Sequence, residues 1–128
     1  MSLPVTSIYI ALATLGLIAL GSRIALMRRK HRISLGYGDN KTLGRAIRVH
    51  GNYIENLPMA LLVMAGLELA GAPAFELHGI GAALLLSRLL HWRGLHGRSG
   101  ATLGRFWGMT LLWLAMGLAA LDLLRRLL

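Results

Sequence analysis

The chain has 128 residues, of which 55% are hydrophobic, and a formal net charge of +9. This length allows one domain, and so high a hydrophobic share excludes an ordinary soluble domain of this size. The absence of cysteine excludes disulfides and a nucleophilic thiol of the chain's own. We therefore predict one integral membrane domain over residues 1–128.

Four apolar stretches follow one another, each close to the roughly 20 residues that cross a bilayer as a helix. They cover about residues 3–26, 47–70, 74–92 and 104–124. The first lacks the basic region that precedes a secretory signal core, so we expect it to be retained as a span. Because the apolar runs are continuous rather than alternating, helices are favoured over a barrel. The sequence predicts an all-α membrane protein, a four-helix transmembrane bundle with up-down-up-down topology.

The basic residues gather in two connections. Eight of the 14 Lys and Arg lie between Arg23 and Arg48, and four lie between Arg88 and Arg105. In the predicted topology these connections share one side of the membrane, which the positive-inside rule makes cytoplasmic. Both termini are then expected on the non-cytoplasmic side, although an arginine pair near the C-terminus argues mildly against it. Membrane topology explains where the basic residues lie, so we predict no nucleic-acid partner.

Hydrogen-bonding side chains crowd the first half of the second stretch, in GRAIRVHGNYIENLPMALLVM. At about 100° per residue, Arg45, Arg48, Asn52 and Glu55 share one narrow helix face, here called the polar stripe. His50 lies on roughly the opposite side, where an interhelical hydrogen bond or interfacial packing is the alternative to a site role. A carboxylate in lipid is costly unless it is paired or faces a polar cavity. Glu55 is therefore a site candidate, with a structural ion pair as the alternative.

Other polar residues lie on the same expected side of the membrane. Arg88 and His91 are one turn apart in the third stretch, Arg105 begins the fourth and Arg28 closes the first. His91 and His96 are five residues apart, about 140° on a helix, which is not the spacing of a helical metal site. We predict no metal. The residues alone indicate an arginine-rich pocket suited to a small zwitterion or anion.

The pattern Arg45-x-x-Arg48-x-x-x-Asn52-x-x-Glu55-x-x-Pro58 resembles the second-helix signature of the MAPEG family, the membrane-associated proteins in eicosanoid and glutathione metabolism. The runs AIRVHGN, YGD and RLLHWRGLHGR are most similar to those of small bacterial members, and the similarity covers nearly the whole chain. The resemblance implies a homotrimer in the bilayer, expected to be the bacterial inner membrane. It also implies that glutathione binds between neighbouring subunits near the cytoplasmic face.

The resemblance assigns roles by position. The residues that would contact glutathione are Arg28, Arg48, Asn52, Glu55 and His91. Arg105 matches the fourth-helix arginine proposed to stabilise the glutathione thiolate, if one extra residue is accepted in the third connection. Arg98 is the rival if the gap is placed elsewhere, and Arg23 is the rival for the first-helix role. The secondary candidates are Arg23, Arg45, His50 and Arg98.

The resemblance implies a glutathione transferase or peroxidase, with glutathione as cosubstrate. The activated thiol would be conjugated to lipophilic electrophiles or would reduce lipid hydroperoxides. Two positions depart from the family pattern: Leu95 replaces the usual third-helix tyrosine, and Gly51 replaces an arginine that some members carry. The alternative is therefore a non-catalytic lipid-binding or scaffolding member. A four-helix multidrug exporter is disfavoured, because residues 1–27 contain no carboxylate.

Overall fold

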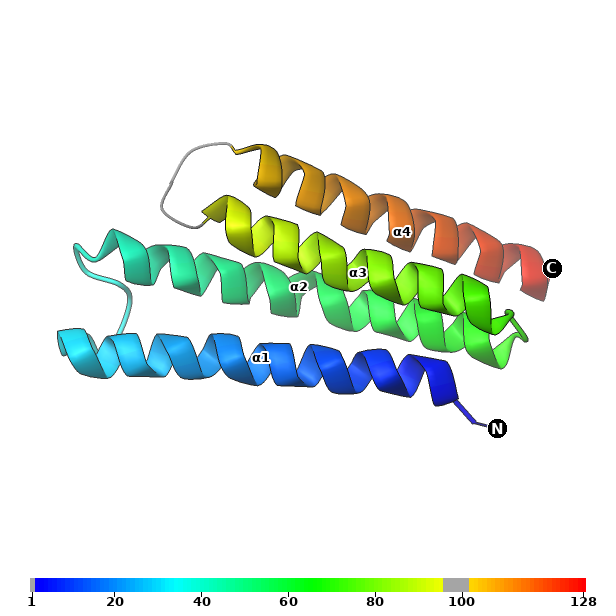
Figure 1. The fold of residues 1–128 in the computed structure, drawn as a ribbon, viewed down its shortest axis with the longest axis horizontal. Helices are drawn as coiled ribbons and strands as arrows, with labels where there is room; N and C mark the ends of the chain where they lie inside the picture. Colours follow the sequence, from blue (N-terminus) through cyan, green and yellow to red (C-terminus); the bar gives the residue numbers. More distant parts are fainter. Residues whose placement is uncertain (1, 96–101) are drawn as a thin grey trace.

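The computed structural model describes residues 2–95 and 102–128 of the chain, and these residues form four helices (Figure 1). The helices are α1 (Pro4–His31), α2 (Lys41–Leu69), α3 (Ala74–Leu95) and α4 (Leu103–Leu127). The described ranges contain no β-strand. The prediction of an all-α, four-helix fold is confirmed, and each helix runs beyond at least one end of its predicted span.

The four helices form an open bundle in which the outer two do not touch. α3 packs most extensively on α4, and α1 packs mainly on α2, while no contact joins α1 to α4 within the described ranges. Both termini and the α2–α3 connection lie at one end of the bundle, and the α1–α2 connection and the start of α4 lie at the other (Figure 1). We call this second end the basic end, because the arginines of the predicted site lie toward it.

Two helices, α1 and α4, are long and apolar enough to cross a membrane. Their outer faces expose large apolar side chains such as Leu15 and Leu118. α2 and α3 carry more charge in their interiors, including Arg48, Glu55 and Arg88. Lipid-exposed charge is costly, so these helices would need to turn their polar faces toward protein or a polar cavity. Crossing of the membrane by α2 and α3 stays a prediction.

The N-terminus of α1 is capped by a side chain from α2. Glu68 accepts hydrogen bonds from the backbone nitrogens of Val5, at 2.8 Å, and Thr6, at 2.7 Å. The first amides of a helix have no partner within the helix, and a carboxylate there also interacts favourably with the helix dipole. α1 has no side-chain cap of its own. Glu68 therefore fixes the position of α1 along α2.

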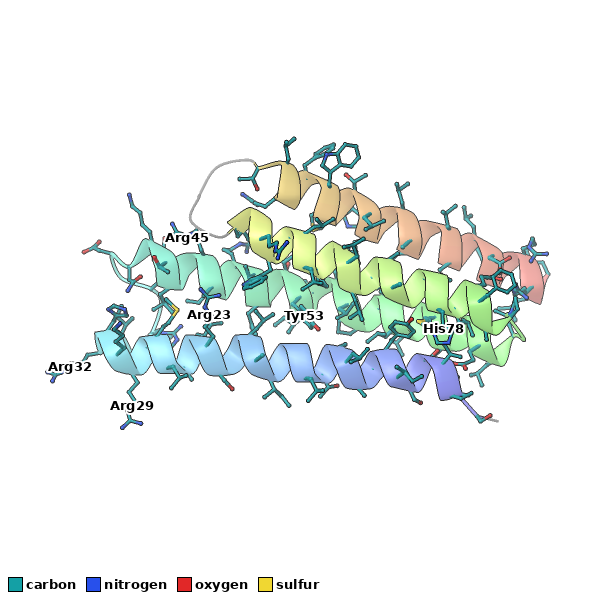
Figure 2. All side chains as sticks on the ribbon, in the orientation of Figure 1. Arg23, Arg29, Arg32, Arg45, Tyr53 and His78 are labelled. Atoms are coloured by element: carbon teal, nitrogen blue, oxygen red, sulfur yellow. The ribbon has the colours of Figure 1, made fainter. Side chains whose placement is uncertain are left out.

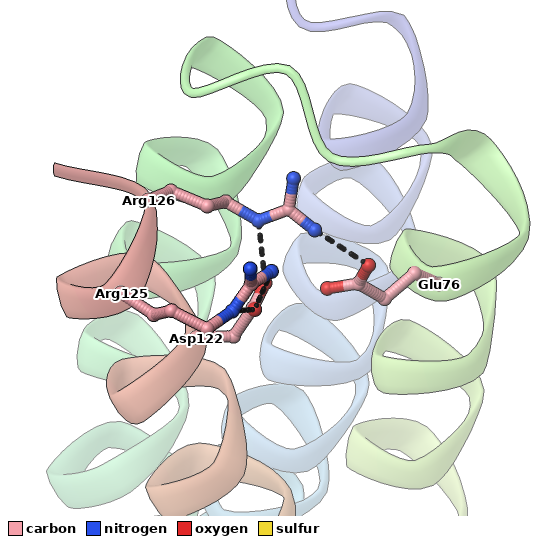
Figure 3. A network of polar contacts seen from close by, with 4 residues as sticks. All are labelled: Glu76, Asp122, Arg125 and Arg126. Carbon is pink, nitrogen blue, oxygen red and sulfur yellow. Dashed lines mark hydrogen bonds and ion pairs between the residues drawn. The ribbon is translucent and has the colours of Figure 1, made fainter.

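An ion-pair network joins α4 to α3 at the end that holds the termini (Figure 3). Arg126 donates to Glu76 Oε2 at 2.9 Å and to Asp122 Oδ2 at 2.5 Å. Arg125 donates to Asp122 Oδ1 at 2.6 Å. The arginine pair that argued mildly against a non-cytoplasmic C-terminus is thus compensated by two carboxylates.

Candidate functional site

A cavity of about 870 Å³ lies between α2, α3 and α4 toward the basic end. Five predicted site residues line this arginine cavity: Arg45, Arg48, Asn52, His91 and Arg105. Apolar side chains of α4, among them Phe106, Met109 and Trp113, form another part of its wall. The structure thus brings together three members of the polar stripe with the third-helix histidine and the fourth-helix arginine.

Buried Arg88 lies behind the wall of this cavity and binds a residue of its lining, Asn52. Its guanidinium donates to Asn52 Oδ1, to Ser87 Oγ at 3.1 Å and to the Gly108 carbonyl at 3.4 Å. Asn52 in turn donates through Nδ2 to the sulfur of Met109 at 3.2 Å. No ion pair joins Arg88 to a carboxylate in the described part of the chain. A positive charge therefore sits inside the bundle, held by neutral groups.

Glycines let α4 approach α3 closely enough to complete the site. A methyl group placed on Gly94 would collide with the backbone nitrogen of Arg105, and one on Gly108 would lie 2.7 Å from that of His91. Thr102 caps α4 by accepting from the Arg105 nitrogen at 3.3 Å, and donates to the Gly94 carbonyl at 2.7 Å. This close contact carries Arg105 to the α3 wall beside His91.

The arginine cavity is strongly electropositive. The charges of Arg48, Arg88 and Arg105 surround His91, which is buried. No aspartate or glutamate is among the described residues that line the cavity. Arg48 makes no hydrogen bond or ion pair with the described residues, so its donors are available to a ligand. Such a cavity suits a carboxylate-bearing ligand, because guanidinium groups bind carboxylates by charge-assisted hydrogen bonds.

Two predicted glutathione contacts lie away from the arginine cavity within this chain. Glu55, the fourth member of the polar stripe, is exposed on α2 and does not line the cavity. Within one chain Glu55 therefore lies outside the cavity that the other three residues of the polar stripe line. Arg28 lies at the end of α1 and donates to the Ile33 carbonyl at 3.5 Å. Their roles in glutathione binding stay predictions.

The secondary candidates are dispersed. His50 faces α1, where its Nε2 lies 3.8 Å from the position of a Cβ on Gly21. This agrees with its predicted separation from the polar stripe. Arg23 lines a different groove, between α1 and the α2–α3 pair. Arg98 lies outside the described residues, so the choice between Arg98 and Arg105 stays open.

Arg88 is the site residue that sequence reasoning underrated. Its spacing of three residues from His91 was visible, but its hydrogen bond to Asn52 depends on how α3 meets α2.

Leu95, the position of the family's usual tyrosine, is buried in the wall of the arginine cavity. A methyl group placed on Gly51 would lie in ordinary van der Waals contact with Glu55 Oε1, at 3.7 Å, so the backbone leaves room for a Cβ there.

Comparison with known proteins identifies the family. The MAPEG family profile matches residues 6–125. The chain belongs to the MAPEG family. Two relatives, each named Inner membrane protein YecN, come from Escherichia coli strain K12 and from Escherichia coli O6:H1 strain CFT073. Each is 34% identical over 117 residues, which are 91% of this chain and 88% of the relative. No solved structure matches the chain.

Family membership confirms the resemblance drawn from the polar stripe. MAPEG proteins are membrane proteins associated with glutathione, and the relatives are inner membrane proteins by name. In this MAPEG chain three residues of the family signature, Arg45, Arg48 and Asn52, line one wall of a cavity, and α3 and α4 supply the others. Within the described residues, no three His, Asp or Glu side chains come together as metal ligands.

Proposed function

We propose that this MAPEG protein is a glutathione-dependent membrane enzyme, a transferase or peroxidase that works at the arginine cavity. The observation that carries the proposal is the meeting of Arg48, Asn52, His91 and Arg105 around one space of about 870 Å³. Glutathione has two carboxylates, an ammonium group and a thiol, and ligand sites of this kind measure about 300–1,000 Å³. The electropositive lining complements its carboxylates.

We infer that the complete site needs a homotrimer. Glu55 is the carboxylate suited to the glutathione ammonium, yet it is exposed and makes no ion pair with the described residues. Arg28 also lies away from the arginine cavity. A neighbouring subunit placed against α2 would cover Glu55 and could bring its own Arg28 to the ligand. This arrangement would also remove a costly carboxylate from lipid.

Arg105 is the proposed catalytic residue. A thiol with a pKa of about 8.5 is mostly protonated at neutral pH, and a close guanidinium favours the thiolate, which is the nucleophile. In conjugation, the thiolate forms a carbon–sulfur bond with a lipophilic electrophile, and the electron pair leaves with the displaced group. In peroxide reduction, two glutathione molecules are oxidised to a disulfide while the hydroperoxide becomes an alcohol and water.

The proposed orientation follows from charge. The ends of α1 and α3 and the starts of α2 and α4 carry most of the basic residues, and they lie at the basic end of the bundle, whereas Arg125 and Arg126 lie at the other end. With all four helices spanning a bacterial inner membrane, the positive-inside rule places this end in the cytoplasm. Both termini are then non-cytoplasmic, and the cavity lies near the cytoplasmic face, where glutathione is supplied.

Calorimetric titration with glutathione, followed by ultraviolet absorbance of the thiolate, tests the proposal. Arg105→Ala should lower the thiolate signal more than binding, because the thiol loses its guanidinium but the carboxylates keep theirs. The matched control is Arg93→Ala, which removes the same charge from an exposed position on α3 outside the cavity. Absence of glutathione binding by the wild-type protein would refute the proposal.

The second candidate function is a non-catalytic lipid-binding or scaffolding role. Leu95 favours it, because an apolar side chain is buried in the cavity wall where the family usually has a tyrosine hydroxyl. The same titration separates the two functions. Glutathione binding without thiolate, and without turnover of a model electrophile or lipid hydroperoxide, would favour the non-catalytic role.

A further inference from the structure

A second hollow lies on the α1 side of the α2–α3 pair. Two adjoining cavities, of about 440 Å³ and 180 Å³, share the residues Leu20, Arg23, Val49 and Trp92. We call their union the α1 groove. α1 forms one wall, and residues of α2 and α3 form the other. The groove adjoins the arginine cavity, and three residues line both: Arg45, His91 and Leu95.

Most residues that line the α1 groove are apolar, and among them Leu12 and Leu85 line its inner part. The buried side chains of Arg88 and His91 also lie along its α3 wall. Arg23 and Arg45 line the part near the basic end, and no carboxylate is among the described residues of either cavity. Tyr53, which also lines the groove, already donates its hydroxyl to the Ala13 carbonyl at 2.8 Å.

Arg23 differs from other arginines near the end of α1. It lies between α1 and α2, whereas Arg29 and Arg32 point away from the bundle (Figure 2). Arg23 is half-buried and makes no hydrogen bond or ion pair with the described residues. Its guanidinium therefore keeps its donors free at the mouth of an apolar groove.

The length of the groove matches one leaflet of a bilayer. Leu12 and Arg23 are 11 residues apart, or about 16 Å along a helix at 1.5 Å per residue. The hydrocarbon core of a bilayer is roughly 30 Å thick, so one leaflet accounts for about 15 Å. A lipid in the cytoplasmic leaflet has its charged group at the interface and its acyl chain directed to the midplane. The α1 groove has the same orientation, with its basic end at the interface and its apolar part toward the midplane.

We propose that the α1 groove binds one acyl chain of an anionic phospholipid, with the lipid phosphate held by Arg23 and Arg45. Basic pockets between transmembrane helices on the cytoplasmic side bind anionic headgroups, and guanidinium groups bind phosphate with two parallel hydrogen bonds. An acyl chain in the groove would also cover apolar side chains of α1 and α3 that no other part of the same chain covers. This site goes beyond the proposed function, because it requires neither glutathione nor catalysis.

Native mass spectrometry of the purified protein, without glutathione, tests the site. Phosphatidylglycerol and phosphatidylcholine with identical acyl chains are supplied in turn, and bound lipid per subunit is counted. The wild type should retain phosphatidylglycerol at least about fivefold better, a difference of about 1 kcal/mol. Arg23→Gln should lose this preference. Arg29→Gln, which removes the same charge from the outer face of α1, should keep it.

A second variant tests the groove without changing charge. Ala19→Phe places a ring in the apolar part of the groove, on a helix that tolerates apolar residues, and should lower retention of phosphatidylglycerol. Equal retention of the two lipids by the wild type would overturn the proposal, as would equal losses from Arg23→Gln and Arg29→Gln. Stronger retention of a free fatty acid would overturn the phospholipid assignment. A change in oligomer mass for Arg23→Gln with unchanged lipid retention would instead assign the groove to a second copy of the chain.

Discussion

Arg88 keeps a positive charge inside the bundle by using neutral partners. Its hydrogen bond to Asn52 orients the amide of the polar stripe, and its bond to the Gly108 carbonyl reaches α4. A buried charge without a counter-ion is stabilised when an anionic ligand arrives. We therefore interpret Arg88 as a positioning residue that also contributes charge to the arginine cavity.

Replacement of Arg88 by methionine separates positioning from folding. Arg88→Met should weaken glutathione binding by about tenfold or more, equal to about 1.4 kcal/mol. The reason is that Asn52 loses its donor and the cavity loses a charge. Thermal stability should change little, because the cost of the unsatisfied amide is offset by removal of a buried charge. Calorimetric titration and thermal unfolding measure the two effects.

Arg88→Lys provides the comparison, since it keeps the charge but lacks the guanidinium fork that reaches Asn52 and Gly108 together. Its binding should lie between that of the wild type and that of Arg88→Met. If glutathione binding decreased only in proportion to the amount of folded protein, Arg88 would have a purely structural role.

At the scale of single residues, the sequence predicted five of the residues that line the arginine cavity. Arg45, Arg48 and Asn52 were placed together by the helical period, and the structure confirms their shared cavity. Glu55 belongs to the same period but is exposed, because helical spacing places residues on a face and does not say how far a neighbouring helix covers that face. The partner of Asn52 was not predictable, since it comes from α3.

Among the elements, α1 depends most on a contact from elsewhere in the chain. It touches α2 and α3 but not α4 within the described ranges, and its outer face is exposed. Glu68 caps its first turn from the last turn of α2, where a carboxylate is unfavourable for α2 itself because of the helix dipole. The tertiary contact therefore explains why an acidic residue occurs at that place.

Removal of the Glu68 charge should loosen α1 without disrupting the rest of the bundle. Glu68→Gln loses the charge–dipole interaction and one of two acceptors, at a cost of about 1 kcal/mol. Hydrogen exchange should become faster at Val5 and Thr6 and stay unchanged in α3 and α4. Unchanged protection of the first turn of α1 would show that the cap does not stabilise it.

The helices themselves followed from the sequence, because long uncharged runs have few other ways to satisfy the backbone in lipid. Two of them, α1 and α4, meet the length and hydropathy expected of a span. α2 and α3 fall short because they carry the charges of the site. The arginine cavity thus lies between these two helices and the apolar helix α4.

For the whole molecule, we propose that Glu55 and Arg28 belong to a site shared between subunits. We expect Glu55→Gln to weaken glutathione binding, and Arg28→Ala to do the same. Co-expression of the two variant chains should restore part of the binding, because some interfaces in a mixed trimer would combine an intact Glu55 with an intact Arg28. Calorimetry on the purified mixed oligomer measures the recovery.

Each variant expressed alone provides the baseline for that recovery. If the two residues served the same subunit's site, no interface of the mixed oligomer would contain both, and binding would stay at the baseline. A wild-type oligomer whose mass differs from that of three chains would contradict the trimer directly.

By itself, the sequence determined the membrane class, the four helices, the polar stripe and the family, because hydropathy, helical period and motif spacing are local properties. Tertiary structure decided which polar groups meet. Gly94 and Gly108 let α4 carry Arg105 to α3, Arg88 bonds Asn52, and Glu55 stays outside the cavity. These outcomes depend on the approach and rotation of helices packed against one another. The pattern along one helix does not contain that information.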